Sequence, residues 1–251
     1  MDNMACLFSH AAILIFESGS TDRTPQLLAS WQANNHHNLC ARYTPLSPHI
    51  TKKLLVPAVE PGLIYKTISR LDRYAAFRNY TLHEALQFAH FDYMANIDMD
   101  ILGIDIKRIL QEFEVAERTR NASVMCVNGM RQMGLFHDSL ASILFNKSWT
   151  YPMDKIDRTN IIWEGGRFTR MISCFGGMAI YRMRDIVDTK CGYMLSREAL
   201  QRYPELERYQ DLDPPGPLTL GICEHIPLHY CLHTQQRKIF LAKDAYLYYG
   251  Y

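Results

Sequence analysis

Apolar and polar positions along the first half of the chain follow the spacing of strands and helices in turn. Apolar runs at 12–16, 93–98 and 123–127 predict buried strands, and 67–90 and 105–113 carry apolar residues at helical spacing. Strands that alternate with helices favour a mostly parallel sheet covered on both faces. The pattern therefore predicts an α/β fold, a single Rossmann-like domain with a mostly parallel central sheet flanked by helices.

The remaining segments are less regular. Residues 45–62 contain four prolines and predict a loop or an irregular crossover, whereas 37–43 has the pattern of a short strand. In the second half, 171–181 is apolar but interrupted by two glycines, and 197–209 has a helical pattern. We expect this half to complete the same domain and to build the acceptor side of a cleft.

Composition places the chain among ordinary globular proteins. Of its 251 residues, 48% are hydrophobic and 21% are charged. The net charge of +1 gives no reason to expect a nucleic-acid partner. The apolar run 11–16 is too short to span a bilayer, and 1–6 lacks the basic residues of a secretory signal. We expect no transmembrane segment in this chain.

The seven cysteines are odd in number and form no Cys-x-x-Cys pair. This favours reduced thiols over a disulfide framework. Three Asn-x-Ser/Thr triplets, at Asn79, Asn121 and Asn146, keep a lumenal location open. The location stays unknown: cytoplasmic, or the lumen of the Golgi or ER if an N-terminal anchor precedes this chain.

An acidic pair, Asp98 and Asp100, follows the apolar run at 93–97. In a strand, positions i and i+2 point to the same side, so both carboxylates would lie at the lip of the sheet. Hard divalent cations take oxygen ligands there and bridge phosphates. The alternative is a capping role at the next helix, for which Asp105 is the better candidate.

Two further polar features flank the predicted helices. The turn Glu17-Ser18-Gly19 with Asp22 is either a helix-entry loop that needs glycine or a site that recognises base and ribose. Arg78 lies about 20° from the apolar stripe of the long helix, so we expect it to turn inward. There it would pair with phosphate or with the acidic pair.

The segment Cys223-Glu224-His225 to His229 has a metal-ligand composition. It reverses the order of the zinc-protease motif, and Pro227 is expected to break a helix there. A structural zinc site would draw on this segment but lacks paired spacing; its candidates are Cys223, His225, His229, Cys231 and His233. The favoured hypothesis is Glu224 as general base, with His225 or His229 as a late metal ligand.

Gly176 and Gly177 precede an apolar strand. They predict either a bulge or bend, or a place where the backbone approaches a sugar closely.

Several of these stretches occur in the order found in one family. The chain resembles GT-A-fold glycosyltransferases that use nucleotide-sugar donors, and its first turn is especially similar to that of fungal capsule-associated mannosyltransferases. The resemblance covers roughly residues 12 to 245. It rests on the motifs at 17–24, 78–79, 98–100, 127–129, 137–138, 175–181 and 223–225.

Two details depart from that family. The mannosyltransferases have Asn-Asp where this chain has Asp98-Met-Asp100. They also begin with a strand before the turn at 17, so that N-terminal strand is missing here or is formed by residues 4–10. The resemblance implies a nucleotide-sugar-binding half at about 12–130 and an acceptor-binding half at about 131–251.

The implied activity is metal-dependent transfer of a hexose from a nucleoside-diphosphate sugar to a hydroxyl of a glycan, protein or lipid-linked acceptor. Mn²⁺ or Mg²⁺ would be held by Asp98 and Asp100 with His225 or His229. Glu224 would be the base of an inverting reaction or would position the acceptor in a retaining one. The resemblance assigns nucleotide-sugar binding to Glu17, Ser18, Asp22, Arg78, Asp98, Gly176 and Gly177.

Two alternatives stand beside this hypothesis. The chain could be a catalytically inactive sugar-nucleotide-binding fragment or partner of the same fold. A phosphohydrolase with an Asp-x-Asp nucleophile is less favoured, because that motif lies near the start of such chains and continues with Thr or Val, whereas Ile101 and Leu102 follow here.

Overall fold

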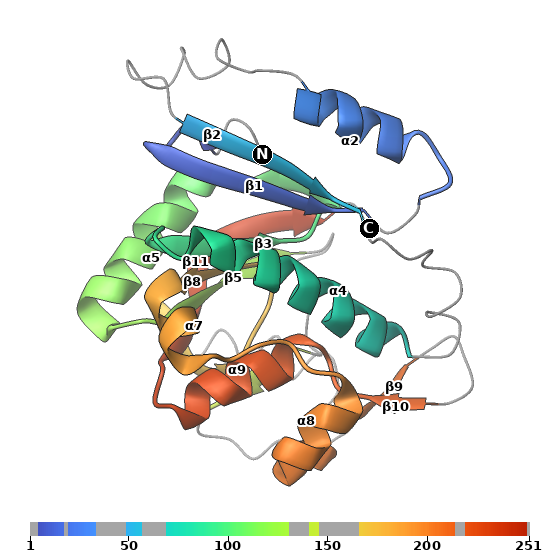
Figure 1. Ribbon diagram of the computed structural model, residues 1–251. Helices are drawn as coiled ribbons and strands as arrows, with labels where there is room; N and C mark the ends of the chain where they lie inside the picture. The colour runs from blue at the N-terminus through green and yellow to red at the C-terminus, as the bar shows by residue number, and fades with distance from the viewer. Residues whose placement is uncertain are drawn as a thin grey trace. The chain divides into compact units, whose positions relative to one another are not determined.

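The computed structural model forms two compact units (Figure 1). One consists of Met1–Ile68 and Tyr80–Phe88, the other of Ser69–Asn79 and Ala89–Tyr251. Helix α4 (Arg70–Ala85) contributes residues to both. The structure describes residues 5–17, 20–33, 49–56, 69–130, 141–145, 166–213 and 219–249.

The first unit contains a two-stranded parallel sheet of β1 (His10–Phe16) and β2 (His49–Leu55). Helix α2 (Thr24–Ala33) lies between them in the chain, as a parallel pair requires a crossover. The prediction of a loop over 45–62 is wrong for β2, because prolines 48 and 57 flank this strand and do not interrupt it. The predicted strand at 37–43 lies outside the described residues, and 5–9 form a turn.

The second unit is built on a larger sheet with the strand order β3-β8-β5-β11-β7-β6, in which β4 also pairs with β11. A separate antiparallel pair joins β9 (Asp211–Asp213) and β10 (Thr219–Gly221). The strands of the larger sheet are β3 (Tyr93–Ile97), β4 (Ile101–Ile104), β5 (Val124–Met130), β6 (Ile143–Leu144), β7 (Phe168–Ser173), β8 (Met178–Arg182) and β11 (Ile239–Tyr249).

The prediction of a mostly parallel sheet is wrong, because this sheet is mixed. Among its described strands, β5 and β11 run parallel and the other pairs are antiparallel. The physical reason lies in the connections. Residues 98–100, which join β3 to β4, are too few for a parallel crossover, so the chain reverses there; β7 and β8 run in the same direction as each other, and each lies antiparallel to its neighbour, β11 or β5.

Side chains of neighbouring residues along β8 face two different helices. Met178 and Ile180 of β8 join the core under α5 (Ile106–Arg120), whereas Tyr181 contacts His229 of α9 (His225–Thr234). Helices therefore cover both faces of the sheet. The predicted start of α5 is confirmed, since the Asp105 side chain accepts a hydrogen bond from the Arg108 N–H at 3.1 Å.

The other described helices follow the sequence pattern in part. The helix predicted at 67–90 is present as α4 and the short η2 (Leu86–Phe88). The one predicted at 197–209 is divided into α8 (Ser196–Arg202) and η4 (Pro204–Tyr209). Helix α7 (Met183–Thr189) follows β8 directly.

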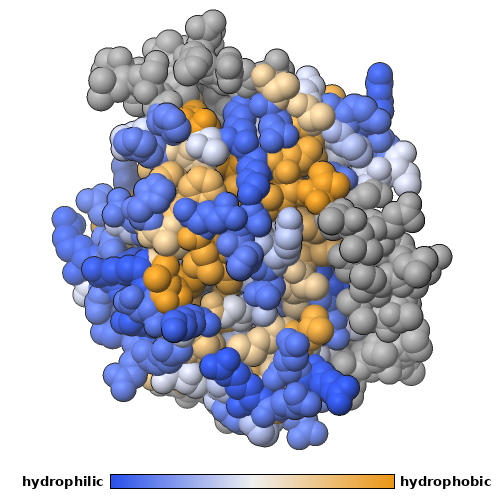
Figure 2. Space-filling model, in the orientation of Figure 1, coloured by the Kyte–Doolittle hydropathy of each residue, from blue (hydrophilic) through white to orange (hydrophobic). Residues whose placement is uncertain are grey.

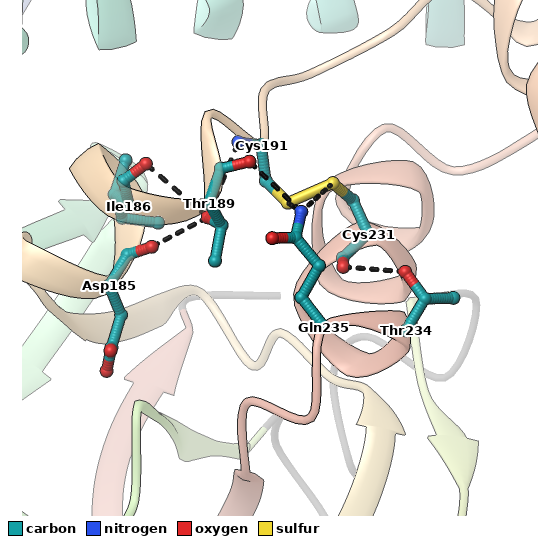
Figure 3. The surroundings of a disulfide bond; sticks show 7 residues. All are labelled: Asp185, Ile186, Thr189, Cys191, Cys231, Thr234 and Gln235. Carbon is teal, nitrogen blue, oxygen red and sulfur yellow. Dashed lines mark hydrogen bonds between the residues drawn. A yellow bond between two sulfur atoms is a disulfide. The ribbon is translucent and has the colours of Figure 1, made fainter.

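The interpretation of the cysteines as reduced thiols is wrong for this structure. Disulfides join Cys126 to Cys174 and Cys191 to Cys231, and Cys6 is disulfide-bonded as well. Partners 48 and 40 residues apart leave no short-range sequence signal, which is why the spacing did not show them. Around the second bond, the Gln235 amide donates to the Thr189 carbonyl at 3.0 Å (Figure 3).

The surface contains both hydrophilic and hydrophobic residues. On the face shown in Figure 2, hydrophilic residues break the hydrophobic ones into separate patches. Met99 and Leu102, which follow the acidic pair's first aspartate, are 62% and 77% exposed. Within the described residues, no helix has the length and apolar character needed to cross a membrane.

Candidate functional site

Arg78 is the centre of an ion cluster in the second unit. Its Nη2 donates to Asp98 Oδ1 at 2.8 Å, its Nε to Glu224 Oε1 at 3.0 Å and its Nη1 to Asn96 Oδ1 at 2.9 Å. The inward turn and the ion pair with the acidic motif, which the helical stripe predicted, are both present. One guanidinium thus ties together α4, the end of β3 and the start of α9.

The packing of α4 explains why Arg78 points there. Leu71 and Ala75 are buried on the same helix face, seven and three residues before it. The side chain is 20% exposed, and its guanidinium lies 5.0 Å from the centre of the Phe175 ring. Burial alone would lower the pKa of Arg78, but the carboxylates of Glu224 and Asp98 outweigh it and the pKa is raised.

The acidic pair lies beyond the end of β3, in the bend that leads to β4. Asp98 is held firmly: its N–H donates to the Gly177 carbonyl at 2.8 Å, and its Oδ2 accepts from the Tyr249 hydroxyl at 3.3 Å. Asp100 is exposed. Because neither residue is in a strand, the rule that positions i and i+2 face the same side does not apply to them.

Glu224 immediately precedes α9 and is 5% exposed. Besides the Arg78 ion pair, its Oε1 lies 3.5 Å from His225 Nε2. The prediction that Pro227 breaks a helix is wrong. Pro227 is the third residue of α9, in the first turn, where a missing N–H removes no intrahelical hydrogen bond.

The two histidines of α9 are core residues. His225 is 1% exposed and stacks on Phe175 with 3.7 Å between ring centres, and burial lowers its pKa well below the usual value. His229 uses both ring nitrogens: Nδ1 contacts Ser173 and Cys174, and Nε2 contacts Tyr181 at 2.9 Å. Burial lowers the pKa of His229 to about 3, so both rings are neutral near pH 7.

These surroundings bear on the expected metal. In the parts of the chain that the structure describes, no three or more His, Cys, Asp or Glu side chains are grouped to hold a metal ion. His229 has no ring nitrogen left to offer, and the disulfide removes Cys231 from the zinc set. Both ring nitrogens of His225 lack a hydrogen-bond partner in the described structure, so His225 remains a candidate beside Asp98 and Asp100. One or two carboxylates suffice for Mg²⁺ when substrate phosphates supply the other ligands.

The glycine pair is explained by the protein's own backbone. A side chain at Gly176 would collide with the backbone of Val127 and Gly129 in β5. Gly177 has a φ of 86°, and the Tyr249 hydroxyl occupies the place of its missing side chain. The link between β7 and β8 therefore needs both glycines where it crosses β5, with or without a sugar.

The remaining candidates belong to the first unit, where the Glu17 and Asp22 carboxylates accept from nearby backbone N–H groups. Glu17 is 6% exposed, and its Oε1 accepts from the Ser20 N–H at 2.6 Å. Asp22 accepts from the Thr24 N–H at 2.8 Å, directly at the start of α2. Ser18 and the predicted motif residues His137 and Asp138 lie outside the described residues.

Sequence reasoning missed two residues of the cluster. Asn96 accepts from Arg78, and its Nδ2 donates to the Tyr193 hydroxyl at 2.6 Å. Asn96 precedes Asp98 by two positions, and a polar residue within an apolar strand was the available signal. Nothing in the local sequence of Tyr193 marks it, because long-range pairing alone brings it to β3.

Comparisons with known proteins give limited help. No protein-family model matches the chain, and no curated protein does. A crystal structure of S. aureus TarS 1-349, a glycosyltransferase, matches with a TM-score of 0.47 and 13% identity, over 95% of this chain and 51% of that one. The chain thus spans about half the length of the TarS chain. At this level of similarity, the function has to be argued from the site itself.

Proposed function

We propose that this protein is a glycosyltransferase that moves a sugar from a nucleoside-diphosphate sugar to a hydroxyl of an acceptor. One observation carries the proposal. Arg78, Asp98 and Glu224, which the family resemblance selects from separate motifs, join in one ion cluster although 20 and 146 residues separate the partners. Packing does not require this convergence, since a buried ion pair is seldom more stabilising than apolar residues of similar size.

Glu224 is the residue proposed to act on the acceptor. Its carboxylate forms an ion pair with Arg78, and a carboxylate is a group that can accept a proton. In an inverting reaction it takes the proton of the attacking hydroxyl as the hydroxyl bonds to the sugar carbon and the diphosphate leaves. In a retaining reaction it holds the acceptor in place. Both outcomes stay open.

Asp98 and Asp100 are the residues proposed to hold Mn²⁺ or Mg²⁺ together with the donor's diphosphate. Such a cation, when bound, stabilises negative charge on the leaving phosphate. Arg78 orients Asp98 through their ion pair, and the Tyr249 hydroxyl supports the other carboxylate oxygen. Glu17, Ser18 and Asp22 remain proposed contacts for the nucleoside.

Transfer and donor-hydrolysis assays over a panel of nucleotide sugars, with glycan, peptide and lipid-linked acceptors and with Mn²⁺ or Mg²⁺, test the proposal. We expect turnover of at least one donor, and its loss in Glu224→Gln. An Asp100→Asn variant that keeps wild-type activity and metal dependence would refute the cation assignment. Calorimetric binding of a donor without turnover on any acceptor would favour the inactive sugar-nucleotide-binding alternative.

A further inference from the structure

A chain of buried hydrogen bonds leads away from the ion cluster and has no part in the proposed chemistry. It runs from Asn96 through the hydroxyls of Tyr193 and Tyr181 to the ring of His229. Tyr193 is 4% exposed, and Tyr181 and His229 are fully buried. The direction of each bond can be worked out, because both ends of the chain meet a group that can only donate.

At the first end, that group is Arg78. A guanidinium has no acceptor, so the Asn96 atom 2.9 Å from Arg78 Nη1 must be the amide oxygen. The amide nitrogen therefore faces Tyr193 and donates to its hydroxyl oxygen at 2.6 Å.

At the other end, the group is the backbone N–H of Cys174, which donates to His229 Nδ1 at 3.3 Å. Nδ1 therefore carries no proton, and the neutral ring has its proton on Nε2. Nε2 then donates to the Tyr181 oxygen at 2.9 Å. The Tyr181 proton is left to face the Tyr193 hydroxyl, which is near enough for each tyrosine to affect the pKa of the other.

Tyr193 thus accepts a hydrogen bond from Asn96 and faces the proton of Tyr181, and neither contact uses its own proton. Burial raises the pKa of Tyr193 to about 12, so the hydroxyl stays protonated. We propose that the Tyr193 hydroxyl is a donor reserved for an oxygen atom of the bound substrate. This inference rests on the proposed function and adds a binding residue to the same site.

The position of Tyr193 supports this role. Its ring lies 5.7 Å from that of His225, the residue after Glu224. Two residues before it, the Cys191–Cys231 disulfide ties its segment to α9, the helix that Glu224 precedes (Figure 3). Arg78 spends three of its five N–H donors on acceptors of the protein itself. Two substrate oxygens can accept a hydrogen bond from Tyr193: a phosphate oxygen of the nucleotide sugar and a hydroxyl oxygen of the sugar-accepting molecule.

The hydrogen-bond direction can be tested without any activity. In protein labelled with ¹⁵N-histidine, NMR distinguishes protonated from unprotonated ring nitrogens. Between about pH 5 and pH 8, His229, assigned through its backbone amide, should carry its proton on Nε2. A proton on Nδ1 would reverse the chain, direct the Tyr193 proton towards Tyr181 and overturn the proposal.

The binding role is tested with Tyr193→Phe in the full chain. We expect kcat/KM to fall about tenfold or more, in the KM for the nucleotide sugar if phosphate is the partner and in the KM for the acceptor if a hydroxyl is. Tyr230→Phe is the matched control, because Tyr230 donates to Glu205 away from the cluster, and it should leave kcat/KM unchanged.

Wild-type kinetics in a folded Tyr193→Phe would overturn the proposal. If Tyr193→Phe fails to fold, the NMR measurement on the unmodified protein still decides it. If the wild type transfers no sugar from any donor, the proposed function fails, whereas the NMR measurement still determines the direction of the hydrogen-bond chain independently.

Discussion

The two units hold their candidate residues in different ways. In the first, Glu17 and Asp22 bond to backbone N–H groups three and two residues away. In the second, Arg78 bonds to Asp98 and Glu224 across 20 and 146 residues. The turn at 17–22 resembles the glycosyltransferase motif as much as the cluster residues do, so the motifs alone do not separate the two units.

The difference shows what kind of contact carries information about function. Asp22, whose carboxylate accepts from the Thr24 N–H at the start of α2, has a sufficient structural explanation in capping. A buried guanidinium that gathers carboxylates from distant segments has no such explanation, because folding would be as well served by apolar residues. Our proposal therefore rests on the second unit.

The largest effect should separate Glu224 from Glu17. Glu224→Gln keeps the size of the side chain but removes the base, and we expect turnover to fall about 10²- to 10⁴-fold. Glu17→Gln should change turnover far less, because an amide oxygen can still accept from Ser20. Steady-state kinetics on both purified variants measure this. Equal losses of turnover in the two variants, or no loss in Glu224→Gln, would contradict the different roles given to Glu224 and Glu17.

The long-range ties of the second unit should also dominate stability. Replacing Cys191 and Cys231 together by Ala opens a loop closed by residues 40 apart, and we expect unfolding to become easier by roughly 4 kcal/mol. Denaturant unfolding of wild type and variant gives the difference. Cys223→Ala, which removes a buried cysteine outside the disulfides, serves as control. A loss below about 1 kcal/mol would show that this tie is dispensable.

The geometry of the cluster is tested by keeping its charge. Arg78→Lys retains one positive charge but cannot donate to three separate acceptors at once, so we expect a loss of roughly 2–3 kcal/mol in unfolding free energy together with reduced turnover. Arg73→Lys on the same helix is the matched control, since Arg73 Nε has no hydrogen-bond partner in the described structure. Similar losses of stability in both variants would mean that lysine destabilises α4 at either position, independently of the ion cluster.

The smallest effect belongs to Asp22. Its side-chain and backbone hydrogen bonds with Thr24 lower its pKa below 3.8, so the charged form stabilises the folded state above that pH, and the stabilisation is lost as the pH falls through the folded pKa. Asp22→Asn should therefore melt slightly earlier than wild type near pH 7, and the difference should shrink as the pH falls below 3.8. A constant difference across this range would contradict the capping explanation.

Local chemistry explains how much of this structure could be predicted. The spacing of apolar residues predicted α4 and the start of α5, where Asp105 caps the helix, but not its end, since α5 continues from the predicted 113 to Arg120. Strand direction could not be predicted, since it depends on whether a link such as 98–100 holds a helix. β4 and β11 were also missed, although both are strands of the central sheet.

The candidate site, like the fold, could be predicted only in part from the sequence. Arg78 lies near an apolar stripe and Asp98 at a strand end, and both positions are visible in the chain. Tyr193 and the disulfide partners are not, because contacts between distant segments leave no periodic mark. Gly176 and Gly177 were predicted to form a bend or to let the backbone approach a sugar. The close backbone contact of Gly176 with β5 and the positive φ of Gly177 explain why both positions are glycine.

A double-mutant cycle on sugar-transfer turnover tests the central claim most directly. Arg78→Met, Glu224→Gln and the double variant are compared with wild type, using the donor that the panel identifies. If the two residues act as one unit in the transfer site, the double variant should be scarcely slower than the more damaged single variant. Losses that multiply, or single variants as active as wild type, would contradict the account.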